Sequence, residues 1–248
     1  MKKQTLTSKK LTTAAILGAI TIVLSLTPLG FIPLGLINAT TMHIPVIIAA
    51  IIEGPVVGGL VGFIFGISSL IKAFTRPTPV SFIFYNPIIS VIPRILIGVV
   101  SYYVYEAIKK ADSKNLRTFS RIIWLLISLA LVYLLYKNIQ SGSSAINIIM
   151  VLILLIISIG LFFYARKTDA VDLPIALGAF LGSMTNTILV LGGIYLLYAE
   201  KYVAALNIPL ANAKSAILGL SITSGIPEAI LSVIITTAVV KAVKKTRR

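Results

Sequence analysis

Residues 53–66 read EGPVVGGLVGFIFG, and glycine recurs in this stretch at every fourth position. The recurring residues are Gly54, Gly58, Gly62 and Gly66. In an α-helix, residues four apart lie on the same face, so these glycines form a flat stripe along one side. Membrane helices use such stripes to bring two backbones close together. The stretch therefore predicts a membrane helix over residues 55–73 that packs closely against another helix of the same chain. The alternative is a contact between subunits.

The composition of the whole chain is that of a membrane protein with several spans. Of its 248 residues, 58% are hydrophobic and only 12% are charged, which lies outside the range of soluble domains. One crossing needs about 20 mostly apolar residues, so the length allows several crossings and no separate soluble domain. The basic start is followed by an apolar run without a small-residue cleavage site, which predicts a retained first helix. The absence of cysteine excludes disulfides and zinc–cysteine sites.

Eight apolar segments are expected to cross the membrane. The expected spans are 11–27, 38–53, 55–73, 87–108, 121–137, 145–165, 172–198 and 211–240. Two of them, within residues 113–171, are nearly pure Leu, Ile and Val and are expected to face lipid. The other six carry the Gly, Pro, Asn and Thr of closely packed helices. We therefore expect an all-α membrane protein with a single transmembrane domain over residues 1–248. It has a six-helix core and a two-helix insertion at 113–171. The alternative is a plain eight-helix bundle.

Most of the 22 Lys and Arg residues occur in four clusters, and the formal net charge is +15. The clusters lie at residues 2–10, 109–121, 166–167 and 241–248. With eight crossings, all four clusters fall on one side of the membrane. The positive-inside rule makes that side the cytoplasm, so we expect a multi-pass cell-membrane protein with both termini cytoplasmic. Anionic membrane lipids are a reasonable partner for these clusters, and nucleic acid is not needed to explain them.

Polar residues within or beside the apolar spans are the candidates for binding a substrate. A charge inside a bilayer is costly and usually faces the protein interior or a watery cavity. Arg94 lies about eight residues, or roughly 12 Å, from the outer end of its span. The candidate substrate-binding residues are Asn38, His43, Arg76, Tyr85, Asn86, Arg94, Thr185, Asn186 and Glu228.

Several of these candidates have a structural alternative that the sequence leaves open. Arg94 and Glu228 are as easily explained by mutual neutralisation as by ligand contact. Asn186 fits an interhelical hydrogen bond, the commoner role of a lone Asn in a membrane helix. His43 fits packing at the interface, and Arg76 fits a solvated charge in a loop.

Catalytic motifs are missing from the sequence. No Gly-Lys dipeptide occurs, so there is no P-loop, and no Gly-x-Ser-x-Gly motif is present. The single histidine, His43, excludes a paired-histidine zinc site. We expect no catalytic residue, no metal and no cofactor. Two other classes stay open. An intramembrane enzyme would use Arg94, Glu228 and His43, and a stand-alone carrier would usually contain internal repeats.

Taken together, these segments resemble the S components of energy-coupling factor (ECF) transporters, the membrane subunits that capture vitamins in bacteria. One of the segments that show the resemblance is the first span, with its Ala-xxx-Ala pair Ala15 and Ala19. The others are TTMHIPVIIAAIIEGPVVGGLVGFIFGISSLI (40–71), VIPRILIG (91–98), GSMTNTILVLGGIYL (182–196) and GIPEAILSVIITTAVVKAVKK (225–245). The resemblance covers nearly all of 8–112 and 172–245. Residues 113–171 depart from it, because S components usually have six helices.

The resemblance implies how such a subunit works with other chains. The vitamin is bound in the outer half of the helix bundle. The first helix docks onto a transmembrane coupling subunit that is driven by two ATPase subunits, which accounts for the missing P-loop. Ala15 and Ala19 are then the partner-docking face.

The resemblance also gives the buried polar residues a role. Gly225 and Pro227 are expected to loosen the last helix beside the vitamin cavity. Glu228 there either accepts a hydrogen bond from the substrate or holds Arg94 in place. The resemblance is closest to S components assigned to pantothenate, which makes pantothenate the expected vitamin. The planar guanidinium of Arg94 or Arg76 suits its carboxylate. Folate, riboflavin and cobalamin stay open as alternatives.

Overall fold

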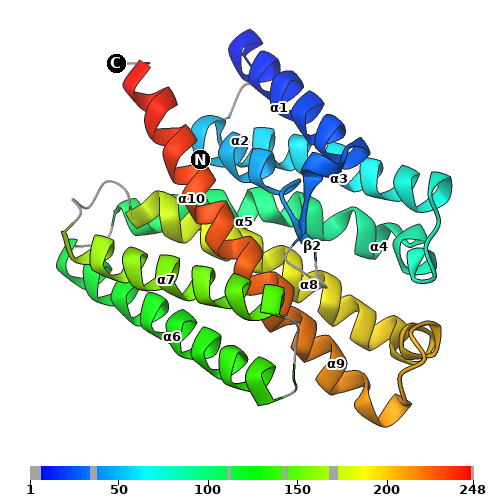
Figure 1. Cartoon of the computed structure of the whole chain (residues 1–248). Helices are drawn as coiled ribbons and strands as arrows, with labels where there is room; N and C mark the ends of the chain where they lie inside the picture. The colour runs from blue at the N-terminus through cyan, green and yellow to red at the C-terminus, as the bar shows by residue number, and fades with distance from the viewer. Residues whose placement is uncertain are drawn as a thin grey trace.

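The computed structural model describes residues 7–33, 38–110, 113–140, 142, 145–167 and 173–246. These residues form long helices packed side by side, with one short β-hairpin between α1 and α2 (Figure 1). Among the described residues, five helical segments are long and apolar enough to cross a membrane. The predicted all-α membrane protein is therefore confirmed, with the hairpin as its one addition in the described part.

The elements follow one another in this order. The long helices are α1 (Ser8–Leu26), α3 (Pro55–Thr75), α5 (Ile92–Lys109), α6 (Ser113–Gln140), α7 (Ala145–Lys167), α8 (Leu173–Ala205) and α10 (Ile226–Thr246). The shorter ones are α2 (Ile44–Glu53), α4 (Pro87–Ser90) and α9 (Ala213–Leu220). The strands are β1 (Phe31–Pro33) and β2 (Asn38–Thr40). Single turns are η1 (Pro28–Gly30), η2 (Ser81–Tyr85), η3 (Leu210–Asn212) and the π-helical η4 (Ser221–Gly225).

The glycine stripe of α3 packs against α5 of the same chain, as predicted. A Cβ atom added to Gly58 would lie 3.1 Å from the Cα of Gly98. One added to Gly66 would lie 2.7 Å from the Cα of Val91, closer than real Cβ atoms approach. At Gly62 the neighbouring atoms are the backbone carbonyl group of Arg94. The two backbones therefore touch along their length, and this contact fixes the start of α5.

Gly54 is the one glycine of the predicted stripe that serves another purpose. It joins α2 to α3 with a φ of 104°, a left-handed conformation that glycine adopts without steric cost. The stripe that packs on α5 therefore begins at Gly58.

Residues 38–53 differ from the predicted spanning helix. Only Ile44–Glu53 are helical, about 15 Å at 1.5 Å per residue, or half of a bilayer core of about 30 Å. Thr40 instead lies opposite Phe31 in the antiparallel hairpin. Pro45 explains where the helix begins, since proline is tolerated in the first turn and breaks a helix further along.

The last helix is interrupted beside Pro227. Residues 213–246 are helical apart from the π-helical turn Ser221–Gly225. Proline has no N–H to donate to the preceding turn, and π-helical turns are a known cause of such irregularity in helices. The expected loosening around Gly225 and Pro227 takes this form.

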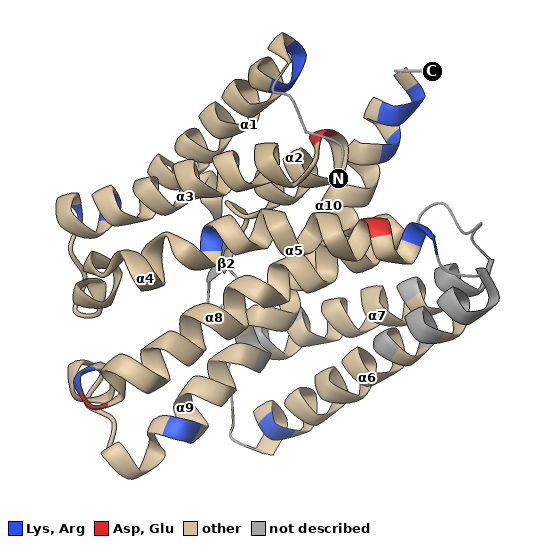
Figure 2. Ribbon diagram, turned by 180° about the vertical axis from the view of Figure 1, so that it is seen from behind, with Lys and Arg blue, Asp and Glu red and all other residues tan. Residues whose placement is uncertain are grey.

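Two hydrogen bonds tie the basic ends of the helices together. Thr13 of α1 donates to the Glu53 carboxylate at the end of α2 over 3.2 Å. Lys244 of α10 donates to the Tyr105 hydroxyl near the end of α5 over 2.5 Å. Figure 2 shows the beginning of α1 and the end of α10 at the same end of the bundle, with basic side chains near both.

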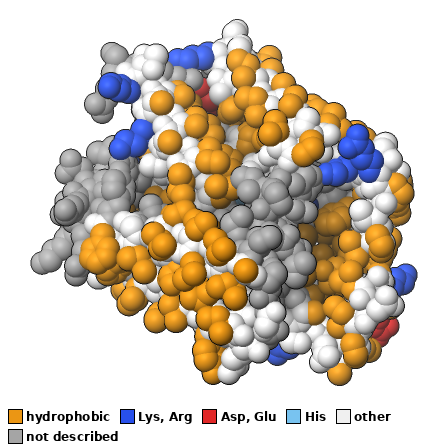
Figure 3. Space-filling model, viewed as in Figure 1, with side chains coloured by type: hydrophobic (Ala, Val, Ile, Leu, Met, Phe, Trp, Pro, Cys, Tyr) orange, Lys and Arg blue, Asp and Glu red, His pale blue; other side chains and the backbone are white. Residues whose placement is uncertain are grey.

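Helices α6 and α7 lie side by side along the edge of the bundle that is far from α1 (Figures 1 and 2). A hydrogen bond of 2.9 Å joins the hydroxyls of Ser128 and Ser158 between them. Trp124 is buried against Phe180 of α8, with the ring centroids 6.3 Å apart. Large apolar side chains such as Leu126 and Ile156 are exposed on the outer faces of the pair. Hydrophobic side chains cover much of the molecular surface (Figure 3).

Candidate substrate-binding cavity

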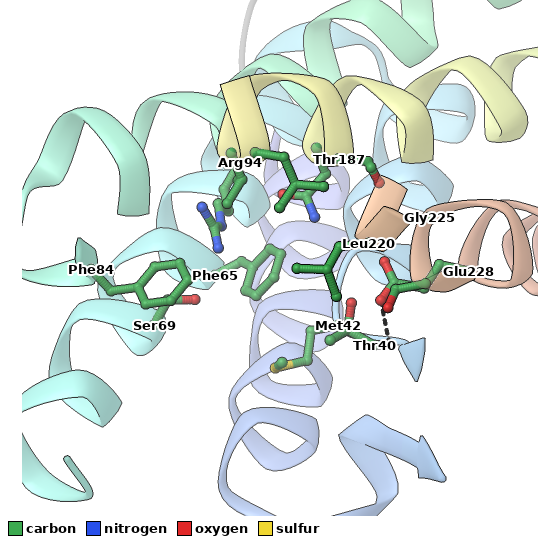
Figure 4. A pocket seen from close by; sticks show the side chains of 14 residues that line it. Thr40, Met42, Phe65, Ser69, Phe84, Arg94, Thr187, Leu220, Gly225 and Glu228 are labelled. Carbon is green, nitrogen blue, oxygen red and sulfur yellow. Dashed lines mark hydrogen bonds between the residues drawn. The ribbon is translucent and has the colours of Figure 1, made fainter. Parts of the chain in front are cut away.

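A cavity of about 220 Å³ lies among α3, α5, α8 and the interrupted last helix (Figure 4). The end of β2 closes one side of it. The lining residues are Thr40, Met42, Phe65, Ser69, Phe84, Arg94, Asn186, Thr187, Val190, Leu191, Leu220, Ser224, Gly225 and Glu228. Its walls are mainly apolar, with a few polar groups and two charged ones, which is the usual make-up of a small-molecule site.

Arg94 points into this cavity from the first turn of α5 (Figure 4). Its side chain is only 6% exposed, and its carbon Cζ lies 5.4 Å from the ring centre of Phe65 and 5.5 Å from that of Phe84. One terminal nitrogen donates to the backbone carbonyl of Ile89, whereas the buried Nε has no partner. A buried charge normally needs a partner. The guanidinium is therefore prepared to bind an anion.

Glu228 faces the same cavity from the first turn of α10, and it is 7% exposed. Its Oε1 accepts a hydrogen bond of 2.9 Å from the backbone N–H of Thr40 (Figure 4). Glu228 and Arg94 line one cavity without forming a direct ion pair. The contact that Glu228 does make holds the end of the hairpin against the last helix.

Asn186 of α8 brings a free acceptor to the cavity. Its Oδ1 is buried and has no hydrogen-bond partner, so this oxygen does not make the interhelical hydrogen bond that was the alternative. The neighbouring Thr187 packs against the π-helical turn. A Cβ added to Gly225 would lie 2.7 Å from the Thr187 methyl carbon. Glycine at this position lets the last helix approach α8.

Comparison with known proteins gives the family. The model of the family described as "ECF transporter, substrate-specific component" matches residues 9–149, more than half of the chain. This chain is a member of that family. The resemblance predicted from the sequence is thereby confirmed, and the fold described above is that of a multi-pass membrane component of a transporter.

Two curated relatives carry more specific names. A pantothenic acid transporter PanT of Lactococcus lactis subsp. cremoris is 27% identical over 225 residues, covering 85% of this S component and 80% of that protein. A pantothenate transporter PanT of Leuconostoc mesenteroides subsp. mesenteroides is 38% identical over 77 residues, which is 29% of this S component and 38% of that protein.

Three further candidates of this S component have local partners and do not line the cavity. The ring of Tyr85 stacks on Phe74, with centroids 4.3 Å apart and planes within 8°. Asn86 caps α4 by accepting from the Ile88 N–H over 3.0 Å. The Thr185 hydroxyl donates to the backbone carbonyl of Leu181, 2.7 Å away. These contacts account for the three residues without a ligand.

His43 and Asn38 lie on the segment that leads to α2. His43 is fully buried, and its Nε2 is 3.0 Å from the Ser183 hydroxyl of α8, so it packs behind the cavity and does not line it. The backbone of Asn38 belongs to β2, whereas its side chain lies outside the described part.

Arg76 lines a second cavity, of about 310 Å³, which also contains Arg94. The structure thus brings Arg94, Asn186 and Glu228 together in one cavity and joins Arg76 to them through the adjoining one. Within the described residues, no three His, Cys, Asp or Glu side chains come together as metal ligands would.

Sequence reasoning missed several residues that line the cavity. Phe65 and Ser69 lie four apart on α3, beside the glycine stripe, and so share one helix face. That spacing was a usable signal, because the stripe already identified the face that packs on α5. Phe84, in contrast, belongs to the single turn η2, where no helical periodicity points to the cavity.

Proposed function

We propose that this S component binds pantothenate in the cavity that contains Arg94, for uptake by an ECF transporter. One observation carries the proposal. A buried guanidinium has an unpartnered nitrogen, and the buried Oδ1 of Asn186 in the same cavity is also unpartnered. The names of the two curated relatives support pantothenate as the vitamin.

The polar groups of the cavity match those of pantothenate. The vitamin has one carboxylate, one amide and two hydroxyls on a short branched chain. Arg94 can bind the carboxylate, because a guanidinium forms strong hydrogen bonds with both carboxylate oxygens. Asn186 Oδ1 can accept from the amide N–H or a hydroxyl. The apolar side chains of Val190, Leu191 and Leu220 suit the two methyl groups.

Size and aromatic geometry favour pantothenate over the alternative vitamins. The cavities of about 220 Å³ and 310 Å³ adjoin one another, and together they fall in the range of about 300–1,000 Å³ that is typical of small-molecule sites. Folate and cobalamin are much larger molecules. A flavin ring would need an aromatic face to stack on, whereas Phe65 and Phe84 both flank the Arg94 guanidinium.

A binding role fits the described residues better than an enzymatic one. The buried Ser183 and His43 form a hydroxyl–imidazole pair, yet neither residue lines the cavity, and the His43 Nδ1 has no carboxylate to orient it. A serine nucleophile needs both access to substrate and an oriented base. The proposal therefore assigns no catalytic residue to this chain.

The membrane orientation in the proposal has both termini in the cytoplasm. Basic residues occur at the first turn of α1 and at the last turns of α5 and α10, and Figure 2 shows these turns toward one end of the bundle. The positive-inside rule favours the cytoplasm for that end. The cavity cations Lys72 and Arg76 then lie toward the outer surface.

Docking of the coupling subunit, which two ATPase subunits drive, is assigned to α1, as membership of the family implies. Gly18 faces inward, where an added Cβ would lie 2.6 Å from Ile64 of α3. Ala15 and Ala19, which lie beside this inward face on α1, are exposed. Leucine at both positions should abolish uptake and leave pantothenate affinity unchanged. Lost affinity with intact coupling to the ATPases would refute this face.

Binding isotherms on the purified protein test the substrate assignment. Arg94→Gln should weaken pantothenate binding by about 2–5 kcal/mol, as expected when a desolvated charged pair is broken. It should weaken pantothenol, in which an alcohol replaces the carboxylate, far less. Lys201→Gln, an exposed cation on α8 outside both cavities, is the control and should change neither affinity. Equal losses for the two ligands would leave Arg94 a scaffold residue.

A further inference from the structure

The second cavity adjoins the one that holds Arg94. It has a volume of about 310 Å³, and five residues line both spaces. The shared residues are Thr40, Met42, Ser69, Phe84 and Arg94. In Figure 4 the Arg94 guanidinium points toward the side where Phe84 and Ser69 lie. The two spaces therefore meet at the guanidinium.

The two adjoining cavities form a continuous path, and residues of α3 line both of them. Phe65, Ser69 and Lys72 are four and three residues apart, so they lie along a single helix face. Arg76 follows four residues later as the C-cap of α3. Arg76 is eleven positions after Phe65, which corresponds to about 16 Å along the helix axis. The path begins at Phe65 in the inner cavity and ends at Arg76 near the end of α3.

The charges along the path have one sign. Lys72, Arg76 and Arg94 all line the second cavity, and among the described residues no Asp or Glu lines it. Glu228 lines only the inner cavity, where it accepts the hydrogen bond from Thr40. Lys72 and Arg76 are one helical turn apart, and like charges at this spacing repel each other. An anion between them would relieve that repulsion.

Exposure decreases along the same path. Arg76 is exposed, Lys72 is half-buried and Arg94 is buried. The far wall near Arg76 is polar, since the Thr78 and Ser81 hydroxyls are 2.9 Å apart and both residues line the cavity. An anion entering from the α3 end would meet the most accessible cation first and the most desolvated one last.

We infer that Lys72 and Arg76 form an outer anion subsite, which captures the carboxylate of the substrate and passes it to Arg94. This inference rests on the proposed function, because it takes pantothenate as the anionic substrate. Clefts lined by charges of one sign raise the association rate of an oppositely charged ligand. The subsite should therefore act on the rate of binding, whereas Arg94 retains the bound ligand.

Stopped-flow kinetics on the purified protein in nanodiscs of zwitterionic lipid tests the subsite. In a double variant with Lys72→Gln and Arg76→Gln, the association rate constant for pantothenate should fall about tenfold. Its dependence on salt should flatten, and the dissociation rate constant should stay within about twofold. Pantothenol should associate equally fast with the wild type and the variant, because it carries no charge.

The matched control is the double variant with Lys201→Gln and Lys214→Gln. It removes the same charge from residues that line neither of the two cavities, and it should leave the association rate nearly unchanged. An equal fall in the control would attribute the effect to net charge and overturn the subsite. A fall for pantothenol as large as that for pantothenate would show damage to the fold and overturn it too.

Anionic lipid headgroups are the competing occupant of the same cations. Phosphatidylglycerol added to the nanodiscs should leave the association rate of pantothenate nearly unchanged. A strong reduction that disappears in the Lys72 and Arg76 variant would assign these cations to a headgroup and overturn substrate capture. A wild type that binds no pantothenate would refute the proposed function itself. If the wild type binds pantothenate normally and the Lys72 and Arg76 variant associates equally fast, only the outer subsite is refuted.

Discussion

The α3–α5 pair and the α6–α7 pair are both apolar helix pairs, but they pack in different ways. Between α3 and α5 the backbones touch, because Gly58 faces Gly98 and Gly62 faces the carbonyl group of Arg94. Between α6 and α7, large side chains occupy the space between the backbones, and a hydrogen bond joins the hydroxyls of Ser128 and Ser158. Gly160 of α7 is exposed, and a Cβ there would have no neighbour within 4 Å, so this glycine takes no part in close helix packing.

The difference follows from what each pair must position. Helices in lipid gain little from apolar contact as such, so close packing decides how firmly two of them are held. The α3–α5 contact sets the place of Arg94 in the cavity. No described residue of α6 or α7 lines that cavity, and side-chain packing is sufficient for this pair.

Gly98→Ala should have the largest effect on stability, because the new methyl group would meet the backbone of Gly58. We expect the free energy of unfolding to fall by about 3 kcal/mol, the upper part of the usual cost of overpacking. Gly160→Ala is the matched control in α7. It should be neutral or gain up to about 1 kcal/mol from the higher helix propensity of alanine. Thermal unfolding in detergent measures both, and equal effects would contradict the distinction between the two pairs.

Gly225→Ala extends the comparison to the contact between the last helix and α8. Its methyl group would lie 2.7 Å from the Thr187 methyl carbon, so one of the two helices must shift beside the cavity. Pantothenate affinity should fall about tenfold, or about 1.4 kcal/mol. Thr187→Ser removes the opposing methyl group and should restore most of this loss in the double variant. Titration calorimetry on the four proteins checks the rescue, and additive losses would contradict the proposed contact.

Deletion of residues 118–168 should have the smallest effect on binding. Helices α5 and α8, which flank residues 113–171, lie next to each other, since a Cβ added to Gly178 would be 3.3 Å from the Cβ of Tyr105. A short join between α5 and α8 should therefore close without strain. The deleted protein should bind pantothenate within about threefold of the wild type, because no described residue of α6 or α7 lines the cavity. A folded deletion protein that cannot bind would assign these helices a part in the site.

Periodic features of the fold were predictable from the sequence, and their partners were not. The four-residue spacing of glycines identified the close-packing face of α3. Nothing in that spacing named Gly98 as the residue opposite Gly58, because a pattern within one helix carries no information about its neighbour. The half-length of α2 was also missed, since an apolar run of sixteen residues does not reveal that its first part pairs as a strand.

The candidate site shows the same limit at the level of single residues. Arg94 and Glu228 were predictable, because a charge in an apolar span needs a protected environment. Thr185 was selected in place of Thr187, although only the latter lines the cavity. Residues two positions apart on a helix, such as Thr185 and Thr187, point in directions about 200° apart. The sequence does not define which of the two directions faces inward. Tyr85 was selected for its aromatic ring, which the structure stacks on Phe74.

The π-helical turn at Ser221–Gly225 has a consequence for how this family can change over evolution. A π turn contains one residue more than an α turn, and it absorbs that residue without rotating the following helix. A relative with one residue fewer in this turn could continue as a plain α-helix, and its counterpart of Glu228 would still face the cavity. Single-residue gaps at this point of an alignment should therefore leave the direction of this carboxylate unchanged.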